Sequence, residues 1–377
     1  MSIIKEIKSD AHIFLAVLFF VVSSLLPLNI ASEWHGFLFQ SIFIFLVLLY
    51  YQSKKISIIS LFLVFFFSIW TVFSAIFISY RFSYVDVFKN IFLIFSLIIL
   101  IKEYNFKNIK KSISFHSLCK IIYTLGGLVV LGFVLRYFFP VIMQKIYPGK
   151  SYITDSISRN SSFFVNPNYA GFSLCVFFLL ILLIPKYRIF KICSIVLIFS
   201  CILLTGSRSS FVCFFWIAIL NSIIFKKSII ALTGSALLLI TSLKYDIGSL
   251  LLFKRTLNMD NLSEIGGRDQ IYKIGIEYID NNLLSFIFGY GISPIDVSDS
   301  LFLNWILRFG VVGFVLFILT VVFLHSKSKS LLYFLCFFPM YFVVEVLNSP
   351  SLILLYFMGL IFYQALQFHN LKRIIID

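Results

Sequence analysis

Twelve apolar runs, most of them long enough to cross a bilayer, limit what this sequence can fold into. A spanning helix needs about 20 apolar residues. The runs lie at 12–30, 34–51, 57–80, 84–101, 120–139, 168–185, 190–206, 209–225, 228–243, 300–324, 331–348 and 350–366. Hydrophobic residues are 60% of the chain, charged residues are 12%, and the mean hydropathy of +1.02 excludes a soluble domain. We therefore expect an all-α polytopic integral membrane protein, with 1–377 as one transmembrane domain.

The basic residues predict how this domain is oriented. If the N-terminus is cytoplasmic, the segments on the same side are all short, and with the borderline Lys120 and Lys191 counted in the nearest loop they hold 18 of the 31 Lys and Arg residues. These segments are 1–11, 52–56, 102–119, 186–189, 226–227, 325–330 and 367–377. Cytoplasmic loops carry such an excess of positive charge, so both termini are expected inside. The basic residues are scattered between apolar runs despite the net charge of +15, which argues against a nucleic-acid partner.

Two long loops, 140–167 and 244–299, fall on the other side. The second is the large external loop of the domain and holds eight of the 16 acidic residues. Helical spacing places Ile271, Ile274, Tyr278 and Ile279 on one apolar face of a surface helix. Arg268, after two glycines, opens this helix, where free N–H groups favour an anion. The alternative is an amphipathic helix that only rests on the bilayer surface.

Two short motifs on the predicted external face allow both a functional and a structural interpretation. Gly206-Ser207-Arg208-Ser209 predicts a tight turn between two helices, where Arg208 either binds phosphate or reaches lipid headgroups. Arg159 arrives at the same face just before a helix that Pro167 and Asn168 are expected to start, with Asn168 as its cap. A second arginine at the same membrane face favours the functional interpretation.

The last part of the external loop contributes a glycine-rich turn and a carboxylate. Phe288-Gly289-Tyr290-Gly291 predicts the turn, and Asp299 precedes the helix that begins at Ser300. Asp299 can cap this helix, or it can act as a base if partial desolvation raises its pKa. The membrane interior offers few ionisable residues, mainly Lys89, Arg308 and Glu345. Because most polar residues that could bind or react lie outside the membrane interior, an enzyme at the external face is favoured over a channel or carrier.

These motifs, in this order, resemble the O-antigen polymerase and O-antigen ligase superfamily over roughly residues 155–320. The matching set is Arg159, Asn166-Pro167-Asn168, Gly206-Ser207-Arg208, Arg268, Gly289-Tyr290-Gly291, Asp299 with Asn304, and Gly310 with Gly313. The resemblance implies a GT-C-like glycosyltransferase of the bacterial inner membrane that acts at the periplasmic face. Its substrates would be glycans linked to undecaprenyl diphosphate, and it would use no metal, nucleotide sugar or other cofactor.

The resemblance also implies roles for individual residues. Arg208 and Arg268 would hold the donor diphosphate, and Asp299 would be the candidate base. Substrate contacts would fall on Arg159, Asn166, Asn168, Arg308 and Tyr290.

One departure from the family pattern separates its two branches. Ligases carry a histidine before the helix that here begins at Ser300, but this chain has Asp299 there and no histidine in 117–324. This favours a polymerase that moves a growing glycan onto a new lipid-linked repeat unit, with a chain-length regulator as a candidate partner. The alternatives are a ligase that joins the glycan to lipid A-core and, from another class, a flippase for lipid-linked oligosaccharides.

Overall fold

The computed structural model describes residues 13–25, 58–78, 87–88, 90–92, 94–95, 98, 114–147, 160–164, 166–225, 273–278, 283–291, 301–327, 330–341 and 350–376. Over these residues the protein is all-α: 90% are helical and none lies in a strand. By length and composition, four of the described helices can cross a membrane: Ile58–Phe77, Phe115–Phe138, Arg188–Thr205 and Phe302–Lys327. These long apolar helices identify a membrane protein.

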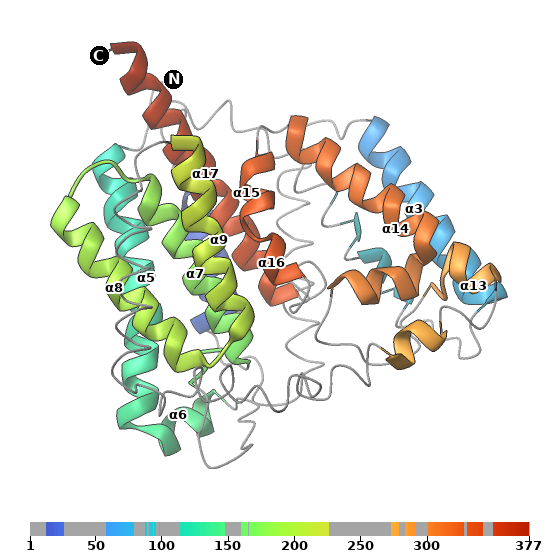
Figure 1. Ribbon diagram of the computed structural model, residues 1–377, viewed down its shortest axis with the longest axis horizontal. Helices are drawn as coiled ribbons and strands as arrows, with labels where there is room; N and C mark the ends of the chain where they lie inside the picture. Colours follow the sequence, from blue (N-terminus) through green and yellow to red (C-terminus); the bar gives the residue numbers. More distant parts are fainter. Residues whose placement is uncertain are drawn as a thin grey trace.

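The centre of the larger helical group is α7 (Pro167–Leu183), which is surrounded by protein on all sides (Figure 1). Of its 17 residues, 16 are buried. Its neighbours are α5 (Phe115–Phe138), α8 (Arg188–Thr205), α9 (Arg208–Phe225) and α17 (Pro350–Ile376). A helix without a polar face fits this position because none of its sides meets water.

Small residues let the neighbouring helices approach α7 closely. A Cβ added at Gly359 of α17 would overlap Tyr333 and lie 2.5 Å from Val176 of α7. A Cβ at Gly126 of α5 would lie 3.4 Å from the Phe177 ring. Membrane helices associate mainly through such close packing, because lipid tails are as apolar as their side chains. The segment Ile13–Leu25, which ends in η1 (Val21–Leu25), packs on α17.

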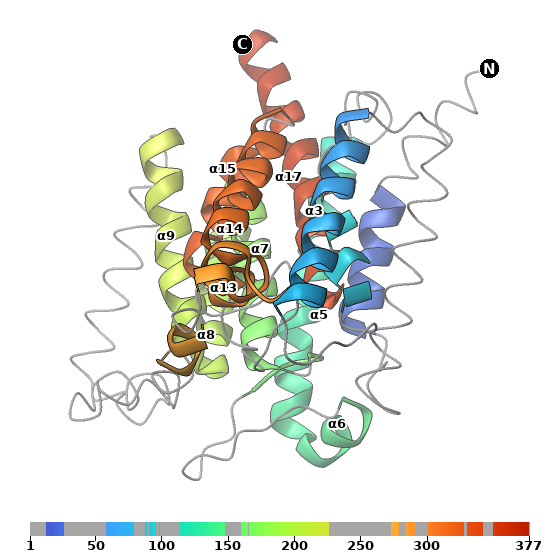
Figure 2. The same cartoon turned by 90° about the vertical axis from the view of Figure 1, so that its right-hand side faces the viewer.

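A second group contains α3 (Ile58–Phe77), α13 (Leu283–Phe288) and α14 (Leu301–Lys327), and it lies on the opposite side of the molecule (Figures 1 and 2). The short helices α15 (Leu331–Cys336) and α16 (Phe338–Tyr341) connect the two groups. The Phe302 ring of α14 lies 5.9 Å from Phe338, and Phe337 lies 5.2 Å from Phe172 of α7.

The predicted straight span at 300–324 is sharply bent. Gly310 has φ 66° and ψ 179°, and the chain on either side of it folds back on itself. The rings of Trp305 and Phe317 lie 3.8 Å apart, although a straight helix would separate these positions by about 18 Å. An apolar run has the same composition whether it is straight or bent, so the sequence pattern could not reveal this bend.

Other predicted boundaries also shift. The first turn of α5 includes the end of the predicted loop 102–119, and α17 continues ten residues past the predicted end at 366. The start of the predicted span 331–348 is divided between α15 and α16. The predicted spans 34–51 and 228–243 lie outside the described residues, so twelve spans remain a prediction.

Segments that were predicted to share the cytoplasmic side do lie at one end of the bundle. Tyr187, after α7, hydrogen-bonds His116 in the first turn of α5. Phe115 packs on His369 near the end of α17, with the ring centroids 5.7 Å apart. Lys191 of α8 donates to the carbonyls of Leu182 (2.6 Å) and Ile184 (3.1 Å) at the end of α7. The opposite end carries α6 (Pro140–Ile146) (Figure 2).

The bend requires a residue that tolerates a positive φ at position 310, and this requirement can be tested. An alanine there would hold a strained positive φ, which costs about 1–3 kcal/mol, and its Cβ would overlap the carbonyl of Ile287. We expect Gly310→Ala to lower the thermal midpoint of the detergent-purified protein. The control is Gly127→Ala, because a Cβ at Gly127 meets nothing within 4 Å and alanine favours a helix. Equal midpoints for the two variants would contradict this account of the bend.

Candidate functional site

The turn between α8 and α9 is short because its own side chains satisfy its backbone. Gly206 ends α8 with φ 59°, and α9 begins at Arg208. Thr205 Oγ1 accepts the Ser207 N–H at 3.1 Å. Ser207 Oγ accepts the Ser210 hydroxyl at 2.8 Å and the Ser210 N–H at 3.4 Å. The predicted tight turn at 206–209 is confirmed, and it places Arg208 at the N-terminus of an 18-residue helix.

This turn packs directly on the first turns of α7. A Cβ at Gly171 would overlap the Ser210 side chain and lie 3.6 Å from the Ser207 Cβ. Cys175 Sγ donates to the Ser210 carbonyl at 3.4 Å. The N-termini of α7 and α9 therefore lie side by side at the same end of the bundle. Each helix N-terminus carries the positive end of a helix dipole, while Asn166 already accepts the N–H groups of Asn168, Tyr169 and Ala170 at the start of α7.

The cap of α7 is Asn166, not Asn168 as predicted. Asn166 has an extended backbone, and its Oδ1 accepts the Asn168 N–H at 2.8 Å. Pro167 occupies the first helical position, which suits a residue that lacks an N–H. Asn168 is instead inside the first turn and buried. The sequence predicted the start of this helix correctly but placed its cap two residues too far along the chain.

The segment before α7 joins the α8–α9 turn to α5. The Asn160 N–H donates to the Leu204 carbonyl at 3.2 Å, and its Nδ2 donates to the Phe133 carbonyl at 3.0 Å. Ser162, with φ 53°, donates its hydroxyl to the Val129 carbonyl at 2.8 Å. Asn160 follows Arg159 in the chain, and Leu204 precedes Arg208 by four residues. Two of the motifs that were predicted to share one face therefore meet.

A residue that the motif search missed, Arg136, holds this arrangement in place. It lies in the last turn of α5, where its Nε donates to the Ser162 carbonyl and its Nη2 to the Tyr147 carbonyl, both at 2.8 Å. Tyr147 in turn donates its hydroxyl to the Leu25 carbonyl at 2.8 Å, and burial raises its pKa. The available signal was a basic residue at the end of a predicted span where the charge rule expects few.

The charged residues that the structure describes at this end are basic, among them Arg136 in α5 and Lys145 in α6. Glu277 is the one acidic residue in the part of the chain that the structure describes, and it belongs to the other helical group. The described bonds of Arg136 go to neutral carbonyls, so they leave its charge uncompensated. Buried serine, threonine and asparagine side chains supply the remaining polar groups: Ser161, Ser162, Asn168, Thr205, Ser207, Ser209 and Ser210. These buried groups hold the turn and the helix starts in place, and the basic residues beside two helix N-termini suit an anion with several oxygen atoms.

Tyr290 and Arg308 lie at the bend of α14, apart from this site. The N–H groups of Tyr290 and Gly291 donate to the Leu307 and Arg308 carbonyls, each at 2.8 Å. The Tyr290 side chain is buried, and its hydroxyl donates to the Tyr278 carbonyl at 2.6 Å. These contacts give the glycine-rich segment a structural function, and the substrate contacts assigned to Tyr290 and Arg308 remain predictions.

The predicted surface helix is helical at 273–278, and it meets the protein through Gly275 and through Tyr278, whose ring centroid lies 6.0 Å from that of Tyr290. Gly275 is buried, and a Cβ there would lie 3.0 Å from Leu303 of α14. Ile274 of the predicted apolar face is 43% exposed. The closest approach to α14 is made by Gly275, which the apolar pattern does not mark. Arg159, Arg268 and Asp299 lie outside the described residues, and of Arg208 the structure describes the backbone.

The chain matches no protein-family model, no curated protein and no solved structure. The resemblance to the O-antigen polymerase and ligase superfamily therefore depends on the ordered motifs alone.

The capping role of Asn166 can be measured. Replacing an Asn cap with alanine typically costs about 1 kcal/mol, whereas serine can still accept the N–H. We expect Asn166→Ala to lower the thermal midpoint in detergent and Asn166→Ser to remain close to the unmodified protein. If the two variants have the same midpoint, the side chain of Asn166 does not cap α7.

Proposed function

We propose that this protein is a polysaccharide polymerase of the bacterial inner membrane. It would transfer a growing glycan from undecaprenyl diphosphate to a lipid-linked repeat unit at the periplasmic face. The observation that carries the proposal is the meeting of two helix N-termini, those of α7 and α9, with the Asn160 segment at one end of an otherwise apolar bundle. Arg208 opens the second of these helices.

A lipid diphosphate fits the chemistry of this end. A diphosphate has several oxygen atoms and more than one negative charge, and the ends of two helix dipoles offer it positive potential. An arginine adds a planar fork of N–H donors whose charge does not titrate. Because the surroundings exclude much of the water, each such hydrogen bond is stronger than in solution. Arg159 and Arg268 are the proposed additional ligands.

The proposed reaction is a glycosyl transfer without a metal. A hydroxyl of the acceptor sugar attacks the anomeric carbon of the donor glycan. The new bond joins that carbon to the acceptor oxygen, and the bond from carbon to diphosphate oxygen breaks. Arg208 and Arg268 would stabilise the negative charge that develops on the diphosphate. Asp299 would take the hydroxyl proton; without a base, the proton would pass to the departing diphosphate, and positioning of the two substrates would suffice.

The remaining residues that were assigned to the substrates have supporting roles in this proposal. Asn166 and Asn168 would act through the N-terminus of α7, which one caps and the other helps to form. A chain-length regulator remains the candidate protein partner. A ligase or a flippase would give a different glycan pattern, so one experiment distinguishes the three.

The test compares Arg208 with Arg188, which begin neighbouring helices at opposite ends of the bundle. In cells that lack the chromosomal copy, the unmodified protein should restore a ladder of glycan lengths, whereas empty cells should show single repeat units. We expect Arg208→Ala to lose about a hundredfold in polymer, because one such contact in a transition state is worth about 3 kcal/mol. Arg208→Lys should fail nearly as badly, since lysine lacks the fork.

The control is Arg188→Ala, since Arg188 opens α8 at the end that was predicted to be cytoplasmic. It should leave the ladder intact. A full ladder from normally expressed Arg208→Ala would contradict the proposed diphosphate site. Loss of every repeat in the deleted cells would indicate a ligase, and lipid-linked repeats confined to the cytoplasmic leaflet would indicate a flippase.

A further inference from the structure

Arg136 has unused hydrogen-bond donors in the last turn of α5. A guanidinium carries five N–H donors, and two of those of Arg136 reach the carbonyls of Ser162 and Tyr147. Both acceptors are neutral, and no acidic side chain in the described part of the chain pairs with Arg136. Its side chain is partly exposed, so the remaining donors can reach a ligand from outside the protein. Arginine with free donors binds anions that carry several oxygen atoms.

The pattern of α5 indicates how deep Arg136 lies in the membrane. The exposed positions of α5 recur every three or four residues from Lys120 to Phe138, so one face of this helix meets lipid along its length. No charged residue lies between Lys120 and Arg136, which are separated by about 24 Å of helix. The hydrocarbon core is about 30 Å thick, and long basic side chains reach past its edges. Arg136 therefore lies near the level of the phospholipid phosphates.

Three aromatic residues indicate the same level. Tyr137, Phe138 and Phe139 directly follow Arg136, and they are 71%, 67% and 53% exposed. Tyrosine is enriched where a membrane meets water. Three consecutive exposed rings would form an apolar patch if they faced water alone, and such patches mark a surface that binds a membrane or a partner. The end of α5 is therefore at the membrane surface rather than beyond it.

The short helix α6 lies across the end of α5 instead of extending it (Figure 2). Its first residue, Pro140, follows the last turn of α5 after a single residue. The residue after its end, Tyr147, accepts the bond from Arg136. Both ends of α6 are therefore held near the level of Arg136, and the whole helix lies at the membrane surface.

The side chains of α6 suit that surface. Val141 and Ile142 are 68% and 55% exposed, whereas Met143 is buried against the protein. Lys145 is exposed and adds a second positive charge. A helix with outward apolar side chains and a basic residue beside them is typical of the boundary between headgroups and hydrocarbon.

We propose that Arg136 and α6 form a binding site for the phosphate of a membrane phospholipid. Arg136 would donate its free N–H groups to the phosphate oxygens, and Lys145 would attract the same negative charge. The acyl chains would lie along the exposed face of α5. Because Arg136 also holds the Ser162 and Tyr147 carbonyls, the bound lipid would fix the segment before α7 at the level of the headgroups. This role is independent of the reaction that the protein catalyses.

The test is photo-crosslinking of the whole chain in nanodiscs of phosphatidylethanolamine and phosphatidylglycerol. One probe is phosphatidylglycerol with a diazirine near the start of one acyl chain. The other is monogalactosyl diacylglycerol with the same acyl chain, which has a headgroup but no phosphate. Mass spectrometry of the peptides measures labelling between Arg136 and Tyr147. We expect the phospholipid probe to label this stretch at least about tenfold more, the effect of one hydrogen bond to a charged group.

Two variants of Arg136 separate phosphate binding from a purely structural role. Arg136→Gln removes the charge and Arg136→Lys keeps it, but neither has the fork that reaches both carbonyls. Both should therefore lower the thermal midpoint in detergent by similar amounts. Labelling by the phospholipid probe should fall about tenfold in Arg136→Gln and much less in Arg136→Lys, because an ammonium group holds phosphate as a point charge. An equal loss of labelling in the two variants would overturn the proposal.

Two exposed aliphatic residues supply variants that leave the core untouched. Val141 is the second residue of α6, and Ile189, 80% exposed, is the second residue of α8 at the other end of the bundle. Val141→Asp should reduce labelling of α6 severalfold, since its charge repels the phosphate. Ile189→Asp should leave that labelling unchanged.

Three further results would contradict the phospholipid site. The first is equal labelling of α6 by the two probes, which would show contact with lipid but no recognition of phosphate. The second is loss of labelling when inorganic phosphate is added, which would assign Arg136 to a free ion. The third is loss of labelling when a trace of polyprenyl diphosphate is added, which would assign Arg136 to the proposed substrate instead.

Discussion

A backbone polar group inside a membrane must find a partner within the protein, and this requirement determines how the chain breaks its helices. At the bend of α14 the carbonyls of Leu307, Arg308 and Phe309 lose their helical partners. They accept instead from Tyr290, Gly291 and the Trp70 indole. The glycine-rich segment after α13 therefore docks on the bend, and both are held against α3. The same requirement explains why serine and threonine satisfy the α8–α9 turn.

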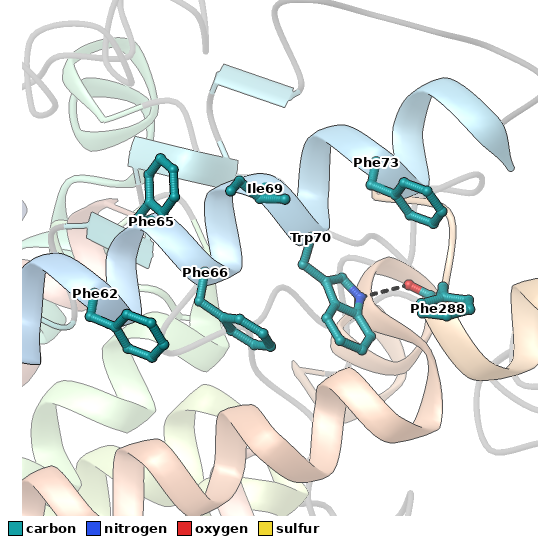
Figure 3. A pocket seen from close by; sticks show the side chains of 7 residues that line it. All are labelled: Phe62, Phe65, Phe66, Ile69, Trp70, Phe73 and Phe288. Carbon is teal, nitrogen blue, oxygen red and sulfur yellow. Dashed lines mark hydrogen bonds between the residues drawn. The ribbon is translucent and has the colours of Figure 1, made fainter.

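The α8–α9 turn and the bend of α14 shape different parts of the molecule. The α8–α9 turn can be short because Gly206 and Ser207 close it, and Gly171 lets it rest on α7. That packing aligns two helix N-termini, which is the basis for proposing a diphosphate site there. The bent α14 supports α13 beside α3, where Phe288 and six side chains of α3 line an apolar groove (Figure 3).

Sequence reasoning succeeded where composition decides the structure. Apolar runs of about 20 residues predicted α3, α5, α7, α8 and α9, and one glycine correctly divided the run at 190–225. It failed where backbone geometry decides. Gly310 bends an apolar run without changing its composition, Gly275 approaches α14 although the apolar pattern does not mark it, and Arg136 bonds carbonyls that no sequence pattern marks. The positions of Arg268 and Asp299 depend on a long loop whose spacing gives no folding rule.

The most direct test of the proposed function is polymerisation by the purified protein in proteoliposomes. The single substrate would be one repeat unit linked to undecaprenyl diphosphate, with a metal chelator present and no nucleotide sugar. The proposal predicts a ladder of lipid-linked products and one released undecaprenyl diphosphate for each bond formed. A preparation that binds the substrate but forms no product longer than one repeat, or that requires an added nucleotide sugar, would contradict it.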